Sequence, residues 1–122
     1  MQSRAANMYR RIDLDSAPKH QILDRLYESF ARDLELARTA IAARDIPGKA
    51  GAIDHAMRIV TELTAALDHA LAPELCSNLE ALYDFVNDRL VQANLSLETA
   101  PLDQASRVMT ELGAAFRQAQ RP

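Results

Sequence analysis

Four long runs of apolar residues, recurring at steps of three and four, dominate this sequence, and a proline lies at or near the start of each: Pro18, Pro47, Pro73 and Pro101. Such steps place side chains on one face of an α-helix, whereas a half-buried strand alternates every second residue. Proline is tolerated in the first turn of a helix and disfavoured in its interior. The pattern therefore predicts four successive helices.

The predicted helices cover residues 18–44, 49–71, 73–94 and 101 onward, separated by breaks at 45–48, 72–73 and 96–100. Short links make neighbouring helices antiparallel, so we expect an all-α, antiparallel up-and-down four-helix bundle. In this prediction residues 16–122 form the bundle, with Ser16 as the first N-cap, and residues 1–15 form a flexible N-terminal arm or a short extra helix. The stripes expected to face the core are Leu23, Leu26, Tyr27, Phe30, Leu34, Ala37 and Ile41; Ile53, Met57, Val60, Leu67 and Leu71; Leu75, Leu79, Leu82, Val86, Leu90 and Ala93; and Leu102, Ala105, Met109, Leu112 and Phe116.

Composition supports the helical prediction. The chain has 122 residues, with 22 Ala and 16 Leu against only 4 Val. Alanine and leucine are among the strongest helix formers, and the β-branched and aromatic residues that favour strands are scarce. A chain of this length is expected to form one domain with a substantial core, without disulfides or metal. A β-sandwich or a doubly wound sheet is disfavoured.

Charge and hydropathy exclude several classes of partner. The net charge of −3, from 14 basic and 17 acidic residues, gives no footprint for nucleic acid. The most apolar stretch, residues 59–72, contains Glu62, Asp68 and His69 and is too short to insert into a membrane. The N-terminus lacks the apolar region of a signal peptide. A single cysteine, Cys76, suits a reducing compartment, so we expect a cytoplasmic protein.

Residue types that carry chemistry are not arranged for catalysis. The histidines His20, His55 and His69 lie on separate segments, and no glutamate is followed by histidine three residues later, as a di-iron bundle requires. Three scattered glycines cannot form a phosphate-binding loop. We expect no enzyme activity, no catalytic residue, no metal and no cofactor. One alternative is histidine phosphotransfer at His55; another is a structural or adaptor bundle that uses its apolar faces to self-associate.

The predicted third helix has more apolar surface than one core contact needs. Tyr83 and Phe85 flank its central stripe on either side and widen the apolar arc beyond that of a helix packed on one core. Inner helices of a bundle contact two neighbours, which is one explanation. A groove that accepts an amphipathic helix from a partner is the other.

The segment NLEALYDFVNDRLVQAN, residues 78–94, resembles the flagellin-specific export chaperones of the FliS family, which share a similar NL..LYD(Y/F) pattern ending in AN. Ala17-Pro18 followed by Ile22-Leu23 and Leu26-Tyr27 resembles the opening of that family's first long helix. Glu62-Leu63 followed by Leu67-Asp68 resembles the end of its second, and Tyr9 resembles the tyrosine of its N-terminal arm. The blocks occur in order and cover nearly the whole chain.

The resemblance implies binding without catalysis. Such chaperones hold the disordered C-terminal helical segment of flagellin in the cytoplasm, prevent premature polymerisation and aid delivery to the flagellar type III export apparatus. An N-terminal arm can cover part of the binding surface until the client displaces it. The partner-binding residues expected on this basis are Tyr9, Ile12 and Leu14 in the arm, the groove-edge aromatics Tyr27, Tyr83 and Phe85, and the asparagines Asn87 and Asn94.

Four positions depart from the family pattern: Ala17 replaces a serine, Glu28 an aspartate and Phe116 a tryptophan, and Pro73 occupies a link that often contains glycine. All four are compatible with the fold. They leave open a divergent member that binds another secreted flagellar subunit.

Overall fold

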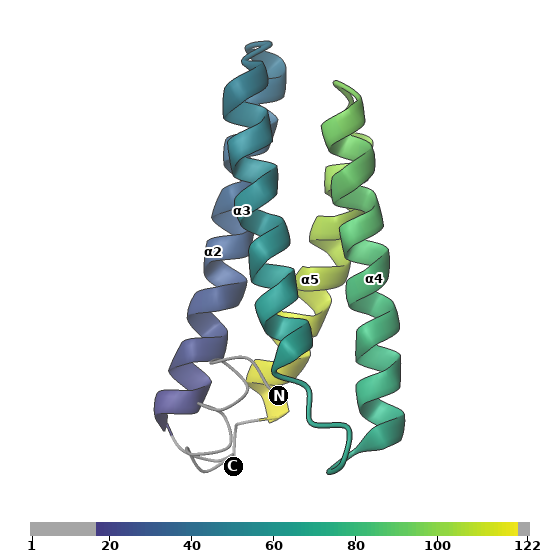
Figure 1. The fold of residues 1–122 in the computed structure, drawn as a ribbon. Helices are drawn as coiled ribbons and strands as arrows, with labels where there is room; N and C mark the ends of the chain where they lie inside the picture. Colours follow the sequence, from purple (N-terminus) through teal and green to yellow (C-terminus); the bar gives the residue numbers. More distant parts are fainter. Residues whose placement is uncertain (1–16, 120–122) are drawn as a thin grey trace.

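The computed structural model describes residues 17–119, and within this range it contains four long helices and no strand: α2 (Ala17–Ala42), α3 (Ile46–Ala65), α4 (Pro73–Leu95) and α5 (Ala100–Ala119). Successive helices run in opposite directions (Figure 1). Each packs against its two neighbours in the order α2, α3, α4, α5 and back to α2. The predicted antiparallel four-helix bundle is therefore confirmed. The predicted arm, residues 1–15, and the Ser16 cap lie outside the described residues.

The bundle consists of two hairpins, α2–α3 and α4–α5, whose internal contacts are more extensive than the contacts between them. The connection within each hairpin is short, whereas residues 66–72 form a longer connection between the hairpins. The starts of α2 and α4 and the ends of α3 and α5 lie at one end of the bundle, drawn at the bottom of Figure 1. The seams α3/α4 and α2/α5 thus separate two more tightly packed halves.

The first break is narrower than predicted, because Asp45 caps the next helix. Its carboxylate Oδ1 accepts a hydrogen bond from the backbone N–H of Gly48 at 3.0 Å, so α3 begins at Ile46 with Pro47 in its first turn. Arg44, with φ of 55°, has the left-handed conformation that commonly ends a helix. The prediction that residues 46–48 lie outside the helix was wrong.

The second helix is shorter than predicted and ends at Ala65 instead of Leu71. Asp68 organises the turn that follows: its carbonyl accepts the backbone N–H of Leu71 at 3.1 Å, and its side chain accepts that of Ala70 at 3.1 Å. Leu71, predicted to face the core, lies exposed in this turn. Proline opens α4 at Pro73 and lies one residue inside the start of α5 at Pro101, as expected.

The core follows the predicted stripes on α2 and α5 and departs from them on α3 and α4. On α3 the buried face includes Ile59 and Leu63 beside Ile53 and Val60, while the predicted core residue Met57 is only half-buried.

On α4, Cys76 and Tyr83 are buried, while the predicted core residues Leu75 and Leu82 are exposed. The buried face therefore differs from the predicted stripe in the first half of α4, whereas Val86, Leu90 and Ala93 are buried as predicted. Cys76 behaves as the small buried hydrophobe that is the commoner role of a free cysteine. The largest fully buried side chains are Phe30, Leu34, Ile53, Val60, Val86, Leu90 and Leu102.

Candidate binding surface

Exposed apolar side chains are concentrated on and beside α4. Of the nine large exposed hydrophobic residues in the described chain, only two, Leu36 and Ile46, belong to the first hairpin. A few scattered apolar side chains are normal on a protein surface, but a concentration along one element is typical of an interaction site. The other seven all lie between residues 71 and 97: Leu71, Leu75, Leu82, Phe85, Val91, Leu95 and Leu97.

Part of this surface is a strip on the side of α4 next to α5. Leu75, Leu82 and Phe85 recur at steps of seven and three and so lie on one side of the helix. Arg89 continues the strip: its guanidinium lies 5.8 Å from the centre of the Phe85 ring, and its Nη1 donates to Gln104 Oε1 on α5 at 3.1 Å. Phe85 is 44% exposed, so its ring remains available to a partner.

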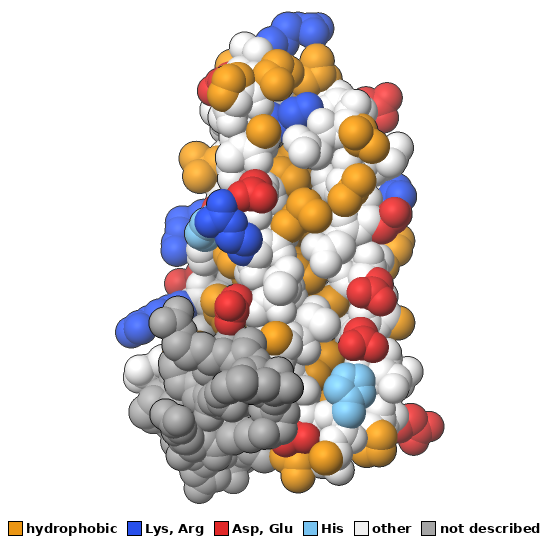
Figure 2. Space-filling model, in the orientation of Figure 1, with side chains coloured by type: hydrophobic (Ala, Val, Ile, Leu, Met, Phe, Trp, Pro, Cys, Tyr) orange, Lys and Arg blue, Asp and Glu red, His pale blue; other side chains and the backbone are white. Residues whose placement is uncertain are grey.

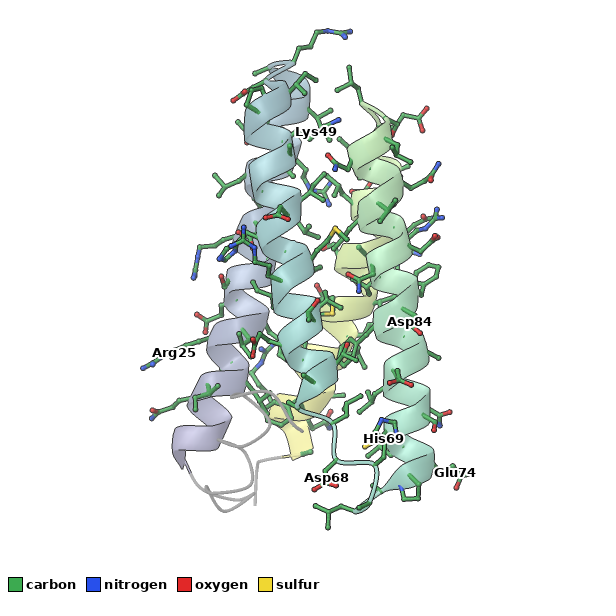
Figure 3. All side chains as sticks on the ribbon, viewed as in Figure 1. Arg25, Lys49, Asp68, His69, Glu74 and Asp84 are labelled. Atoms are coloured by element: carbon green, nitrogen blue, oxygen red, sulfur yellow. The ribbon has the colours of Figure 1, made fainter. Side chains whose placement is uncertain are left out.

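The outward face of α4 combines acidic and apolar groups. Val91 and Leu95 lie one helical turn apart, and Leu95 is 77% exposed. Asp84 and Asp88 precede them on the same side of the helix, where Asp88 accepts a hydrogen bond from Arg89 at 2.6 Å. Figure 2 shows acidic side chains gathered over α4 and basic ones over the opposite hairpin. Asp84 lies on α4 well away from Arg25, which extends from α2 (Figure 3).

Tyr83 does not lie at the edge of a groove, which corrects its predicted role. It is only 4% exposed, and its hydroxyl lies 3.1 Å from that of Tyr27, from the helix diagonally across the bundle. Burial raises the pKa of Tyr27 above its ordinary value of 10.0, and the hydrogen bond to Tyr83 offsets part of this rise. The two tyrosines are therefore a polar contact inside the core.

Tyr27 also lines a pocket of about 250 Å³ between α2 and α5. Phe30 and Met109 contribute apolar surface to this pocket, and Glu28 and Arg117 are among its polar residues. The half-buried Tyr27 therefore contributes both to the core and to a small surface depression, and it is distant in the fold from the outward face of α4. Its prediction as a partner-binding residue is not tested by these contacts.

The two asparagines lie in different environments. Asn87 is half-buried, and its side-chain Oδ1 is buried without a hydrogen-bond partner in the described structure. Asn94 is exposed, and its backbone carbonyl accepts a hydrogen bond from Lys49 Nζ at 2.8 Å. Asn94 was predicted either to bind a partner or to cap the end of the helix. Because α4 ends at Leu95, Asn94 lies in the last turn of the helix.

Lys49 is a structural residue that the sequence analysis missed. It is 5% exposed, and its ammonium group also donates to the carbonyl of Ser96 at 3.1 Å. These bonds satisfy carbonyls at the end of α4 that have no partner within the helix. The sequence did contain an indication that Lys49 faces the core. It lies four residues before the core residue Ile53, on the same side of the helix, and small residues flank it.

The predicted site residues do not form one continuous surface. Tyr83 is buried, Tyr27 lies on the α2/α5 seam, and Phe85 lies on the α4 strip. The arm residues predicted to dock, Tyr9, Ile12 and Leu14, lie outside the described residues. The surface neighbours of Phe85 are Leu75 and Leu82, which were predicted to lie in the core, and not Tyr83.

The described histidines are surface groups with acidic neighbours. His55 Nδ1 lies 2.6 Å from Oδ2 of the buried Asp33, and His69 Nε2 lies 3.8 Å from a carboxylate oxygen of Glu80. Between residues 17 and 119 there is no group of three potential metal-ligating side chains. No helix in the same range is long and apolar enough to cross a membrane.

Comparison with known proteins identifies the family of this chain. The model of the family described as Flagellar protein FliS matches residues 1–122. The chain belongs to the FliS family. The resemblance seen in residues 78–94 is thus confirmed over the whole sequence.

Three FliS relatives share most of their length with this chain. The Flagellar secretion chaperone FliSB of Pseudomonas aeruginosa is 32% identical over 117 residues, which cover 93% of each chain. The Flagellar secretion chaperone FliS of Salmonella typhimurium is 30% identical over 84% of this chain and 77% of its own. That of Bacillus subtilis is 29% identical over 91% and 82%. The FliS family is one of secretion chaperones and not a class of enzymes.

Proposed function

We propose that this FliS protein is a cytoplasmic chaperone that binds the disordered C-terminal helical segment of flagellin. In this proposal it prevents premature polymerisation and helps deliver the subunit to the type III export apparatus. The observation that carries the proposal is the concentration of exposed apolar side chains along α4. Membership of a family of flagellar secretion chaperones supports it.

The physical basis is the covering of apolar helix faces. A client segment without a core of its own becomes ordered only where a partner supplies apolar surface. Leu75, Leu82 and Phe85 supply such a surface at helical spacing, which suits an amphipathic helix docked along α4. Arg89 beside Phe85 supplies a cation at the edge of the strip.

The N-terminal arm supplies regulation in this proposal. Tyr9, Ile12 and Leu14 dock on the apolar surface of the free chaperone and leave it when client binds. Competition of this kind lowers apparent affinity by the fraction of time that the surface is open. Deleting residues 1–15 is then expected to accelerate client association, measured by stopped-flow anisotropy; unchanged association rates would remove the arm from the mechanism.

The test of the α4 surface uses the purified chain and a labelled C-terminal peptide of flagellin from the same organism. Leu82→Asp and Phe85→Asp together are expected to weaken binding at least about 100-fold, because burial of each side chain contributes about 1.5–3 kcal/mol, or about 3–6 kcal/mol for the two. Leu36→Asp, an exposed leucine on α2, is the matched control and leaves affinity unchanged. Circular dichroism verifies that each variant remains folded.

Two outcomes would contradict the proposal. Equal loss of affinity in the Leu36 control and the α4 variant would remove α4 as the specific surface. If the unaltered chain forms no complex with its flagellins at micromolar concentration, flagellin is not the client. Capture of another secreted flagellar subunit in the same assay would then identify the alternative client, and self-association alone would favour a structural or adaptor bundle.

A further inference from the structure

An apolar patch lies where the start of α3 meets the end of α4. Val91 is 41% exposed and Leu95 is 77% exposed, and the two lie one helical turn apart on α4. Ile46, 50% exposed, opens α3 one turn before Lys49, whose ammonium group binds carbonyls at the end of α4. Figure 2 shows hydrophobic side chains gathered over α3 and α4 in this region. Ile46, Val91 and Leu95 make up the α3/α4 patch.

The α3/α4 patch lies on a different side of α4 from the strip proposed to bind the client. At about 100° per residue, Val91 lies about 180° around the helix from Leu82 and about 120° from Phe85. A single client helix docked along the strip therefore leaves the α3/α4 patch uncovered. Exposed large apolar groups that gather at one place are typical of an interaction site, so contact with a second partner would explain them.

The same face of α4 carries a row of acidic residues next to the patch. Glu80, Asp84 and Asp88 follow one another at steps of four. Val91 and Leu95 continue this row at steps of three and four, and all five side chains are exposed. The row therefore changes from acidic to apolar along one side of the helix, over about 23 Å at 1.5 Å per residue.

Few cations of the chain offset the acidic row. Asp88 is bonded by its neighbour Arg89 at 2.6 Å, and Glu80 lies 3.8 Å from His69 Nε2. Asp84, between them, forms no ion pair or side-chain hydrogen bond within the part of the chain that the structure describes. The whole of α4 has four acidic residues and one basic residue, a net charge of −3. The row therefore attracts a cationic surface, with Asp84 as its central acceptor.

The sign of this charge distinguishes the possible occupants. An acidic face repels nucleic acids and anionic membrane surfaces. A second copy of the same face would bring like charges together, which costs affinity. A protein helix with basic and apolar side chains on one side is complementary to both parts of the row. The observations therefore favour a partner helix of that kind.

We propose that this face of α4 binds a basic amphipathic helix of a second protein, while the strip on the other side of α4 remains open to the client. Apolar side chains of that helix cover Val91 and Leu95, and lysine or arginine side chains pair with Asp84 and its acidic neighbours. The helix lies antiparallel to α4, so its cations are near its own C-terminus, where the helix dipole favours positive charge. The proposal does not depend on the identity of the client.

The expected complex is weak and salt-sensitive. A partner helix that spans the row from Glu80 to Leu95 has about 16 residues, so the contact is a single helix pair. Such a contact buries less than the roughly 1,200 Å² of a stable interface and is typical of transient assemblies. Exposed ion pairs contribute little individually and are screened by salt. The dissociation constant is therefore expected at about 10–100 µM in low salt and higher as salt is added.

The experiment uses the full chain and a synthetic, fluorescent, alanine-based peptide. The peptide carries two leucines one helical turn apart, followed by three lysines at steps of three, four and four residues, which reproduces the row in reverse. Binding is measured by fluorescence anisotropy in low and high salt. Asp84→Arg and Leu95→Gln are each expected to weaken binding about fivefold or more. Glu111→Arg on α5 and Leu36→Gln on α2 make comparable changes at exposed positions on other faces and leave the affinity unchanged.

Two further measurements separate this surface from the client site. The variant with Leu82→Asp and Phe85→Asp is expected to bind the basic peptide normally, and so is the chain saturated with the flagellin peptide. A peptide with glutamate in place of lysine is expected not to bind. The proposal is overturned if the basic peptide does not bind the unaltered chain, if the glutamate peptide binds equally well, or if Asp84→Arg and Glu111→Arg have equal affinities. Exclusion of the basic peptide by bound client would also overturn it, because the two would then share one surface.

Discussion

The two hairpins share one topology and differ in what they present to solvent. In the α2–α3 hairpin the packing between the helices is the most extensive in the bundle, and charges of both signs balance. The α4–α5 hairpin is acidic and holds most of the exposed large apolar side chains of the described chain. Both hairpins thus contribute to the core, but the exposed apolar surface lies mainly on the second.

This difference shows why total hydrophobic content is a poor guide to the core. The side chain of Leu34 on α2 is almost completely buried, whereas those of Leu75 and Leu82 on α4 are exposed. Exposed leucines contribute little to folding free energy, so another benefit is needed to explain them, and a binding surface supplies one. Substitutions on both hairpins break or sharpen this contrast.

The largest effect is expected from matched phenylalanines on the two hairpins. Phe30→Ala removes a fully buried ring from α2 and is expected to lower the free energy of unfolding by about 3–5 kcal/mol. Phe85→Ala, on α4, removes an exposed ring and its contact with Arg89, at a cost of about 1 kcal/mol or less. Urea denaturation measures both. Equal losses would show that the α4 strip belongs to the core.

A smaller effect is expected where the hairpins meet through Lys49. Lys49→Met keeps the apolar stem but removes the donor to the carbonyls of Asn94 and Ser96, and we expect a loss of about 1–3 kcal/mol. Hydrogen exchange is expected to accelerate at the end of α4. Arg58→Met, an exposed cation on the same helix, is the control with little effect. Equal stability of the two variants would contradict the structural role of Lys49.

The tyrosine pair that joins the hairpins across the core is expected to contribute about 0.5–1.5 kcal/mol. Tyr27→Phe and Tyr83→Phe each remove one side of the bond, so the double variant is expected to lose less than the sum of the singles. Strict additivity in a urea-denaturation cycle would show that the hydroxyls do not interact.

The same pair predicts a dependence on alkaline pH. Because the pKa of Tyr27 is raised in the folded state, its neutral form is favoured there. Its contribution to stability is complete below pH 10.0, the ordinary tyrosine value, and is lost as pH rises through the folded pKa. Tyr27→Phe should therefore flatten the fall of stability above that pH. An unchanged slope would assign the fall to other groups.

The smallest effect concerns two glycines of α3. A Cβ at Gly51 meets nothing within 4 Å, so Gly51→Ala is expected to stabilise the helix by about 0.5–1 kcal/mol. At Gly48 a Cβ would lie 2.3 Å from the Asp45 carboxylate, so Gly48→Ala displaces the cap and destabilises. Thermal denaturation distinguishes the two signs. Stabilisation of both would show that the Asp45 cap contributes nothing.

Much of the bundle could be predicted because helix spacing and proline are local signals. Phe30, Ile53 and Leu102 were assigned correctly to the core, since each lies in the middle of an unambiguous stripe. The face of α4 could not be assigned, because Tyr83 and Leu82 are adjacent and similarly apolar. Which of the two side chains is buried depends on the hydrogen bond between Tyr83 and Tyr27 on the diagonally opposite helix, and Tyr27 is 56 residues away in sequence.

The candidate site was harder to predict than the fold. Phe85 was identified, but its neighbours Leu75 and Leu82 were assigned to the core because leucine at helical spacing is usually buried. Sequence alone does not distinguish a wide stripe that contacts two neighbours from one that faces solvent. Lys49 was missed for a related reason: a lysine is seldom buried unless its ammonium group has hydrogen-bond acceptors. Its acceptors, the carbonyls of Asn94 and Ser96, are distant in sequence.

The direction of the helices determines where a fusion partner can be attached to this protein. The start of α2, the end of α5 and the connection at residues 66–72 all lie at one end of the bundle (Figure 1). A fluorescent protein joined directly before Ala17 or after Ala119 therefore stands at that end, and linking these two residues would allow the chain to be reopened within the connection. The opposite end, closed by the turn at Arg44 and the link after Leu95, remains unobstructed for attachment to a surface or a second label.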